Sequence, residues 1–166
     1  IKGPEEMWEL GTRDVGSYAT FTDVIEYFEW LGSKFSSIKS NRHEKFLSAS
    51  KFIHKQEDNL VNTILFGKDN IKGLSNYPNI KIIGGLENKL REGLVSFSFP
   101  DLPSEIIVKE LNEKGIRTHI RKSDHYSGNI LEPLGLNNCV RVSMCHYNTE
   151  DEVLQFLTGM NEIIYR

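Results

Sequence analysis

The chain has 166 residues, which is enough for one domain or slightly more. A hydrophobic fraction of 39% is typical of a globular protein with a buried core, and a net charge of −3 shows no basic surplus of the kind that nucleic-acid-binding proteins carry. No apolar run approaches the ~20 residues of a membrane span, and no signal-peptide pattern is present. We therefore expect a cytoplasmic protein that binds neither nucleic acid nor a membrane.

The first third of the chain predicts two long helices. Residues 17–32 form the first, with Ser17 as its cap and Gly32 at its end. Residues 40–56 form the second, and residues 58–67 continue or restart it. The apolar side chains of the first helix recur at spacings of three and four: Tyr18, Phe21, Val24, Ile25, Phe28 and Leu31. Residues 68–78, rich in Asn, Asp, Gly and Pro, predict a loop.

The rest of the chain predicts, in order, two strands, a helix, a strand, a loop, a strand and a helix. Residues 122–138 predict a long polar loop, and Thr149 with Glu152 predicts a capping box that opens the closing helix. The order of elements predicts an α+β domain with a small, mainly antiparallel or mixed sheet, helices packed on one face, and two long helices in front. The predicted strands cover residues 79–85, 93–100, 116–121 and 139–145, and a further helix covers residues 103–115.

Arg141 stands in the middle of the last predicted strand, CVRVSMC. A guanidinium fixed on a strand suits a bidentate grip on a carboxylate, and the alternative is an ion pair with a nearby acid. The residues alone leave both readings open. Alternation along the strand sends one set of side chains to each face: Val140, Val142 and Met144 to the first, and Cys139, Arg141, Ser143 and Cys145 to the second.

The two cysteines of the chain flank this strand. Their Cα atoms would lie roughly 20 Å apart at ~3.3 Å per residue, well beyond the roughly 7 Å that a disulfide spans. We therefore expect two free thiols, which suit a reducing compartment. The chain opens at Ile1 without an initiator methionine, and we expect it to be part of a longer protein.

Other candidate sites rest on weaker patterns. Gly11 and Thr12 form a turn ahead of the first helix, which either presents a hydroxyl and backbone N–H groups to a phosphate or is a simple loop. A metal site drawn from His119, Asp124, His125 and His146 matches no known ligand spacing, so we expect no metal. Thr149 is expected to be a helix cap, while His146 and Asn148 beside it could donate to a ligand.

Several motifs in this order resemble the class V aminotransferase superfamily, which comprises fold type I pyridoxal-phosphate enzymes. They are WELGTRD before a helix that ends in Leu-Gly, a long helix with His43-Glu44, GLVSFSF, EKGIRTHIR and VRVSMCHYNTEDEVLQFL. The most specific parts are the E-x-G-T turn and the R-x-S-x-x-x-Y-N-T corner. The similarity runs over nearly the whole chain and is closest to the cysteine-desulfurase-like members.

The resemblance implies that the chain is the C-terminal part of such an enzyme, acting on an amino acid as a homodimer. Residues 1–32 would hold the GT turn and the connecting helix from the large domain, and residues 33–166 the small domain. The cofactor lysine would lie upstream, so this segment has no catalytic residue and is expected to be inactive alone. Arg141 would grip the substrate α-carboxylate. The hydroxyl of Thr12, with Gly11 allowing the turn, would reach the phosphate of pyridoxal phosphate, typically in the neighbouring subunit. Apart from the resemblance, the loop that follows the strand 116–121 offers His125 or Tyr126 for a substrate-facing position, and His125 is our candidate.

One departure bears on the reaction. The desulfurase branch carries its sulfur-accepting cysteine in the loop after the GI strand, but residues 121–138 contain no cysteine, and Asp124, His125 and Tyr126 occupy the early part of that loop. Transamination, a lyase reaction or epimerisation of an unidentified amino acid therefore remain open. The alternatives are a cysteine desulfurase or selenocysteine lyase proper, and a non-catalytic binding or assembly module of the same fold.

Overall fold

The computed structural model describes residues 14–166, and the chain divides into compact units on either side of the Phe52–Ile53 bond. The helix α2 (Arg42–Phe66) runs through this division and belongs to both units. The expected boundary between residues 32 and 33 stays a prediction.

The first unit contains α1 (Val15–Ser33) and the beginning of α2. The cap of α1 is Asp14 rather than Ser17, because the Asp14 carboxylate accepts a hydrogen bond from the Ser17 backbone N–H and the helix begins earlier than predicted. Gly32 allows the two helices to approach closely, since a Cβ at this position would lie 1.8 Å from the carbonyl oxygen of Lys45. Glu29 of α1 joins the helices through an ion pair with Lys45 at 3.1 Å.

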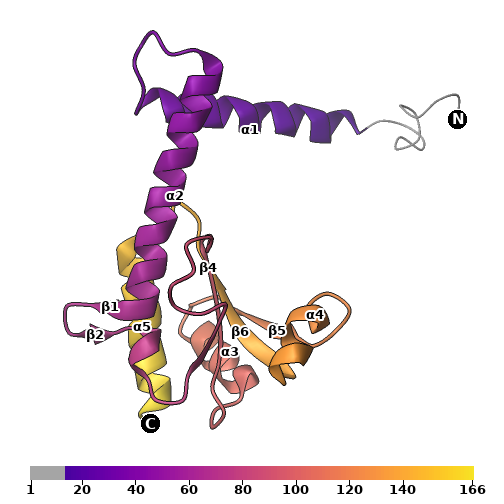
Figure 1. Ribbon diagram of the computed structural model, residues 1–166, viewed down its shortest axis with the longest axis vertical. Coiled ribbons are helices and arrows are strands. Elements are labelled where there is room, and N and C mark those ends of the chain that lie inside the picture. Colours follow the sequence, from indigo (N-terminus) through magenta and orange to yellow (C-terminus); the bar gives the residue numbers. More distant parts are fainter. Residues whose placement is uncertain (1–13) are drawn as a thin grey trace, which may run out of the picture. The chain divides into compact units, whose positions relative to one another are not determined.

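The second unit is built around a four-stranded antiparallel sheet in the order β3-β4-β6-β5 (Figure 1). This confirms the predicted α+β class with a small antiparallel sheet. The strands are β3 (Lys81–Ile83), β4 (Leu94–Ser98), β5 (His119–Lys122) and β6 (Asn138–Ser143), and the helices after α2 are α3 (Ser104–Glu113), α4 (Gly128–Leu131) and α5 (Glu150–Ile164).

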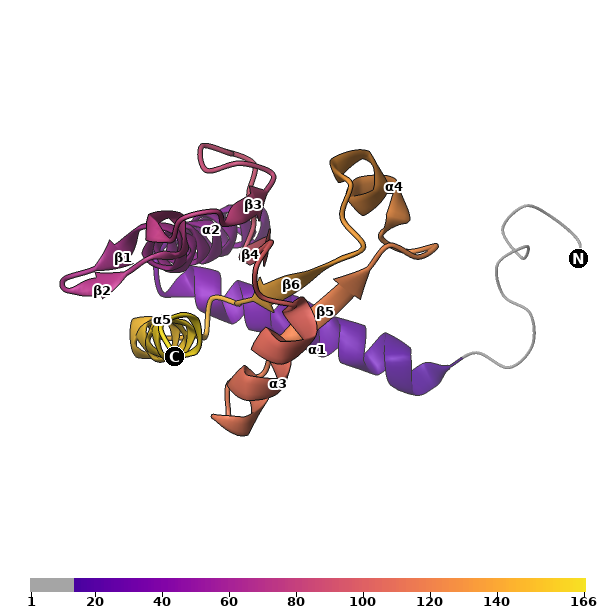
Figure 2. The same ribbon diagram turned by 90° about the horizontal axis from the view of Figure 1, so that it is seen from below.

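The main core lies on one face of this sheet. Val95 and Phe97 of β4 and Val140 of β6 are fully buried there, at 0% exposure. The second half of α2 together with α3 and α5 covers this face, and Figure 2 shows these helices on one side of the sheet and α4 on the other. Their most deeply buried side chains are Leu60, Ile64, Leu65, Ile107, Leu111, Leu157 and Met160.

The two predicted loops contain short structured segments. Residues 68–78 hold a tight hairpin in which β1 (Gly67–Lys68) pairs with β2 (Ile71–Lys72), followed by a 3₁₀ helix at Leu74–Asn76. The turn of this hairpin places Asp69 at a positive φ of 52°, which an aspartate tolerates better than most residues. Residues 122–138 hold α4 and a 3₁₀ helix at Glu132–Leu134.

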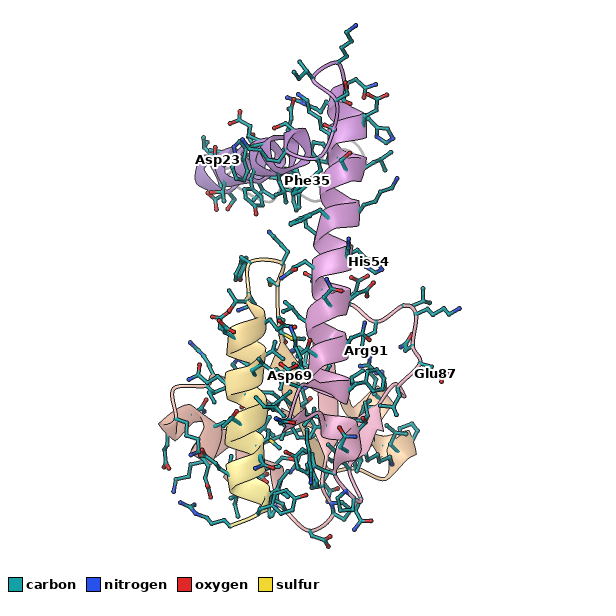
Figure 3. All side chains as sticks on the ribbon, turned by 90° about the vertical axis from the view of Figure 1, so that its left-hand side faces the viewer. Asp23, Phe35, His54, Asp69, Glu87 and Arg91 are labelled. Atoms are coloured by element: carbon teal, nitrogen blue, oxygen red, sulfur yellow. The ribbon has the colours of Figure 1, made fainter. Side chains whose placement is uncertain are left out.

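The loop between β3 and β4 is held by Arg91. Its guanidinium donates to the carbonyl oxygens of Ile83 at 3.1 Å and Leu94 at 3.2 Å, so it ties the end of one strand to the start of the next. Figure 3 shows Arg91 and Glu87 on this loop. The loop ends at Gly93, whose carbonyl accepts a hydrogen bond from the Met144 N–H at 2.7 Å. The chain just after β6 is therefore anchored to the sheet.

Candidate active site

Arg141 lies on the sheet face opposite the main core, which we call the far face. Its neighbours Val140 and Val142 are buried in the core at 0% and 7% exposure, whereas Arg141 itself is half-buried. The predicted alternation along this strand is confirmed. β6 is an inner strand, bonded to β4 on one side and β5 on the other, so the backbone of Arg141 is held by two ladders.

The register places polar side chains on both sides of Arg141. Ser96 of β4 and His119 of β5 are its direct cross-strand partners, and Ile83 of β3 pairs in turn with Ser96. Directly opposite residues present their side chains on the same face. The row Ile83, Ser96, Arg141 and His119 therefore runs across the whole far face.

The guanidinium of Arg141 is not satisfied by the described part of the protein. Its Nε is buried and has no hydrogen-bond partner, and no residue within 14–166 forms an ion pair with it. A buried donor left without a partner costs about 1–3 kcal/mol, and buried polar groups are nearly always paired. Within residues 14–166 no acid forms an ion pair with Arg141, and its role in binding a substrate carboxylate stays a prediction.

A second row of the far face lies nearer the other end of β6. Arg121 of β5 pairs directly with Cys139 of β6, and Lys81 of β3 pairs with Ser98 of β4. The Lys81 ammonium reaches across to donate to the carbonyl oxygen of Leu134 at 2.8 Å, so the segment that contains α4 borders this row.

The second row also contains a buried thiol. Leu131 of α4 and Cys139 are 1% and 2% exposed, yet both lie outside the main core cluster. Burial raises the pKa of the Cys139 thiol, an effect that the nearby Ser96 hydroxyl and Arg121 guanidinium oppose only in part. Cys139 is therefore held as a neutral thiol, and both cysteines are free.

His125 lies away from the row of Arg141. Arg141 pairs with His119 at one end of β5, whereas His125 follows the other end, where Lys122 pairs with Asn138. His125 is exposed, and its ring lies 3.9 Å from that of Tyr126 between centroids. Asp124 organises this turn by accepting hydrogen bonds from the backbone N–H groups of Tyr126 and Ser127, and the first of these is the largest cause of its lowered pKa. The role of His125 stays a prediction.

The corner after β6 is a structural turn. Asn148 accepts a hydrogen bond from the Cys145 N–H at 2.8 Å and donates to Glu152 at 3.1 Å, so its amide is already engaged. Thr149 and Glu152 form the predicted capping box, which is confirmed. The backbone N–H of Thr149 is the largest cause of the lowered pKa of Glu152.

The remaining expectations fall outside this site. Gly11 and Thr12 lie outside the described residues. Between residues 14 and 166 no cluster of three or more His, Cys, Asp or Glu side chains is arranged to hold a metal ion. In the same range, none of the helices combines the length and the apolar character that crossing a membrane requires.

The sequence did not predict that His119 and Arg121 are neighbours of Arg141. Both His119 and Arg121 lie in the predicted strand 116–121, but the sequence could not show that this strand pairs with the one that carries Arg141. The register in which two strands pair cannot be read from the pattern of either strand alone.

The family described as aminotransferase class-V matches residues 53–156. A probable cysteine desulfurase of Pyrococcus abyssi is 27% identical over 161 residues, covering 97% of this chain and 34% of that protein. A probable cysteine desulfurase of Mycolicibacterium paratuberculosis is 25% identical over 162 residues, covering 98% of this chain and 20% of that protein. The chain thus spans about a third or less of the length of these curated relatives.

Solved structures show the same fold. A cysteine desulfurase from Escherichia coli matches with a TM-score of 0.63 at 18% identity, covering 95% of this chain and 32% of that one. A cysteine desulfurase from Thermococcus onnurineus matches with a TM-score of 0.58 at 25% identity, covering 79% of this chain and 33% of that one. The match to the family model, which covers most of the chain, shows that this protein belongs to the class V aminotransferase family.

Proposed function

We propose that this chain is the C-terminal part of a pyridoxal-phosphate-dependent enzyme that acts on an amino acid, and that Arg141 binds the α-carboxylate of the substrate. The observation that carries this proposal is the buried Nε of Arg141, which has no partner among the described residues. Membership of the class V aminotransferase family supports the class of enzyme.

The surroundings of Arg141 suit carboxylate binding. A guanidinium presents parallel N–H donors that match the two oxygens of a carboxylate, and such charge-assisted bonds are stronger than neutral ones. Since β6 is hydrogen-bonded on both sides, the backbone of Arg141 has little freedom, and its side chain extends from a fixed Cα position. A carboxylate held in this way fixes the orientation of the amino acid, which is a large part of what an active site supplies.

Pyridoxal phosphate, when bound, supplies the electron sink for the carbanion that forms at the substrate Cα. The family resemblance assigns its phosphate to Gly11 and Thr12, and it assigns the cofactor lysine to a part of the protein upstream of this segment. Among the described residues, the fit to this chemistry rests on Arg141. The contribution of this chain is to bind the α-carboxylate and so to align one bond of the Cα for cleavage.

Cysteine desulfuration is the second candidate reaction, because the similar proteins named above are described as cysteine desulfurases. That reaction needs an accessible thiolate. Residues 121–138 contain no cysteine, and Cys139 is only 2% exposed with a pKa that burial raises. Cys145 is half-buried and lies two residues beyond the end of β6. These observations favour transamination or a lyase reaction over sulfur transfer through a cysteine of this segment.

We also propose a cytoplasmic homodimer. The support for the dimer is the family resemblance, in which the Thr12 hydroxyl reaches the cofactor phosphate of the neighbouring subunit. Sedimentation analysis of the full-length protein tests this directly, and a monomer that still binds the cofactor would contradict it.

The test of the proposed function uses the full-length protein purified with pyridoxal phosphate. Visible absorption is followed while L-alanine, L-cysteine and other amino acids are added in turn to the wild type and to an Arg141→Ala variant. We expect a spectral change that saturates with at least one amino acid in the wild type. In the variant the concentration for half-saturation should rise on the order of 10- to 100-fold, the loss expected for charge-assisted hydrogen bonds.

Arg166→Ala is the matched control, because it removes the same group from an exposed surface pair with Glu110 at 2.8 Å. It should titrate like the wild type. A full-length protein that shows no cofactor absorption would overturn the proposal and favour the non-catalytic module. An unchanged response in Arg141→Ala would overturn the role of Arg141 alone.

A further inference from the structure

A second unpaired arginine shares the far face with Arg141. Arg121 of β5 pairs with Cys139, which lies two residues from Arg141 on β6, so the two arginines are diagonal neighbours on adjacent strands. Diagonal neighbours in an antiparallel pair lie about 7–8 Å apart, within reach of each other for long side chains. Their guanidinium groups therefore border the same part of the far face.

The guanidinium of Arg121 has no acidic partner among residues 14–166, although acids lie nearby in sequence. The carboxylate of Asp124 accepts from the Tyr126 N–H at 2.9 Å, and that of Glu132 accepts from the Ser123 hydroxyl at 3.4 Å. Both acids serve the turn around α4 instead of neutralising Arg121. Two arginines without an acidic partner among residues 14–166 are thus left at diagonal positions of the far face, where an anionic ligand would neutralise both.

The thiol beside Arg121 does not supply that anion. Arg121 is half-buried next to Cys139, whose thiol is 2% exposed. The Arg121 charge favours the thiolate of Cys139, but burial outweighs it and the pKa of the thiol stays raised. The thiol therefore remains neutral and cannot act as the counter-ion.

We propose, on the basis of the function proposed above, that Arg121 binds a second anionic group of the substrate, so that the enzyme takes an amino acid whose side chain ends in a carboxylate. Arg141 holds the α-carboxylate and Arg121 holds the side-chain carboxylate. A dicarboxylic amino acid carries its two carboxylates a few bonds apart, and each guanidinium offers a planar fork of N–H donors to one of them. One ligand then neutralises both arginines.

The experiment measures dissociation constants for L-aspartate, L-glutamate, L-alanine and L-cysteine with the full-length, cofactor-loaded protein, from spectral titration and from calorimetry. We expect the acidic amino acids to bind on the order of 10- to 100-fold more tightly than the neutral ones in the wild type. Arg121→Gln should abolish this preference by weakening the binding of L-aspartate and L-glutamate, and Arg121→Lys should keep part of it.

The control variant is Lys122→Ala. Lys122 carries the same charge on the same strand but points to the opposite face, so its loss should leave the preference intact. Equal affinities for acidic and neutral amino acids in the wild type would overturn the role of Arg121, whatever the variants do. The proposed function would nevertheless stand if Arg141→Ala bound neutral amino acids more weakly than the wild type does. Binding of no amino acid at all would overturn both proposals.

Discussion

Replacing Arg141 by methionine tests whether this arginine binds the substrate or stabilises the fold. Methionine keeps most of the apolar stem and removes the guanidinium, including the buried Nε that has no partner. An unsatisfied buried donor costs about 1–3 kcal/mol, so its removal offsets the lost packing of the longer side chain. We expect the free energy of unfolding to be unchanged or to rise by about 1 kcal/mol, while amino-acid binding is lost.

The opposite expectation holds for an arginine that has a buried partner. Breaking a buried ion pair from one side costs about 3–5 kcal/mol, because the other charge is left uncompensated. A change of 1 kcal/mol moves the melting temperature by roughly 2–4 °C in a domain of roughly 150–250 residues, so the two cases are well separated. Differential scanning calorimetry of the full-length protein without amino acid measures the difference.

Val140→Ala calibrates this measurement. Val140 is adjacent to Arg141 on the same strand and is 0% exposed on the core face. Losing two buried methyl groups and leaving a cavity should cost about 2 kcal/mol. A loss of stability in Arg141→Met as large as that in Val140→Ala, or larger, would refute the conclusion that the guanidinium is free to bind a ligand.

Three further predictions follow from the structure. Thr149→Ala should lower the free energy of unfolding by about 1 kcal/mol in chemical denaturation, because it removes the cap of α5. The pKa of Glu152 is lowered in the fold, mainly by the Thr149 N–H. The ionised Glu152 carboxylate therefore stabilises the fold fully above its usual pKa, and this stabilisation is lost as the pH falls through the lowered pKa. Glu152→Gln should therefore make the free energy of unfolding less dependent on pH in the acid range. Cys145 should react with iodoacetamide well before Cys139, which mass spectrometry of the native protein would reveal, and equal rates would contradict the burial of Cys139.

The elements predicted well from the sequence are those with a long or strict period. Val95, Ser96 and Phe97 alternate apolar and polar within the predicted strand 93–100, and β4 buries both apolar residues at 0% exposure. Residues 40–67 were divided between two stretches, yet α2 runs without a break from Arg42 to Phe66. Charged residues in its middle interrupt the apolar period but do not oppose the helix, because Lys, Gln and Glu are good helix formers.

The short elements could not be predicted by periodicity. A strand of two residues, such as β1 or β2, shows no alternation, and a helix of one turn, such as α4, shows no apolar stripe. The available signal for the hairpin was the turn pair Asp69-Asn70, since both residue types tolerate positive φ. The composition of the segment was interpreted as a loop instead.

Some features of the candidate site follow from local sequence patterns, and others depend on contacts between distant parts of the chain. That Arg141 leaves the core follows from its two valine neighbours, which is a local pattern. The strand order β4-β6-β5 brings together residues that are distant in sequence. It places Ser96 and His119 on either side of Arg141 and puts Arg121 at a diagonal position. A strand pattern states which face a residue takes but not which strands lie beside it.

The position of Arg141 on an inner strand is itself an argument for function. An arginine on an edge strand can extend its guanidinium past the sheet into water, but β6 has neighbours on both sides, so Arg141 must project from the face of the sheet. There the other residues of β6 on the same face, Cys139 and Ser143, are small and carry no charge. The buried Nε of such a side chain costs free energy unless it has a hydrogen-bond partner. Within residues 14–166 it has none, so the folded domain retains this cost until a ligand carboxylate, or another part of the protein, meets the guanidinium.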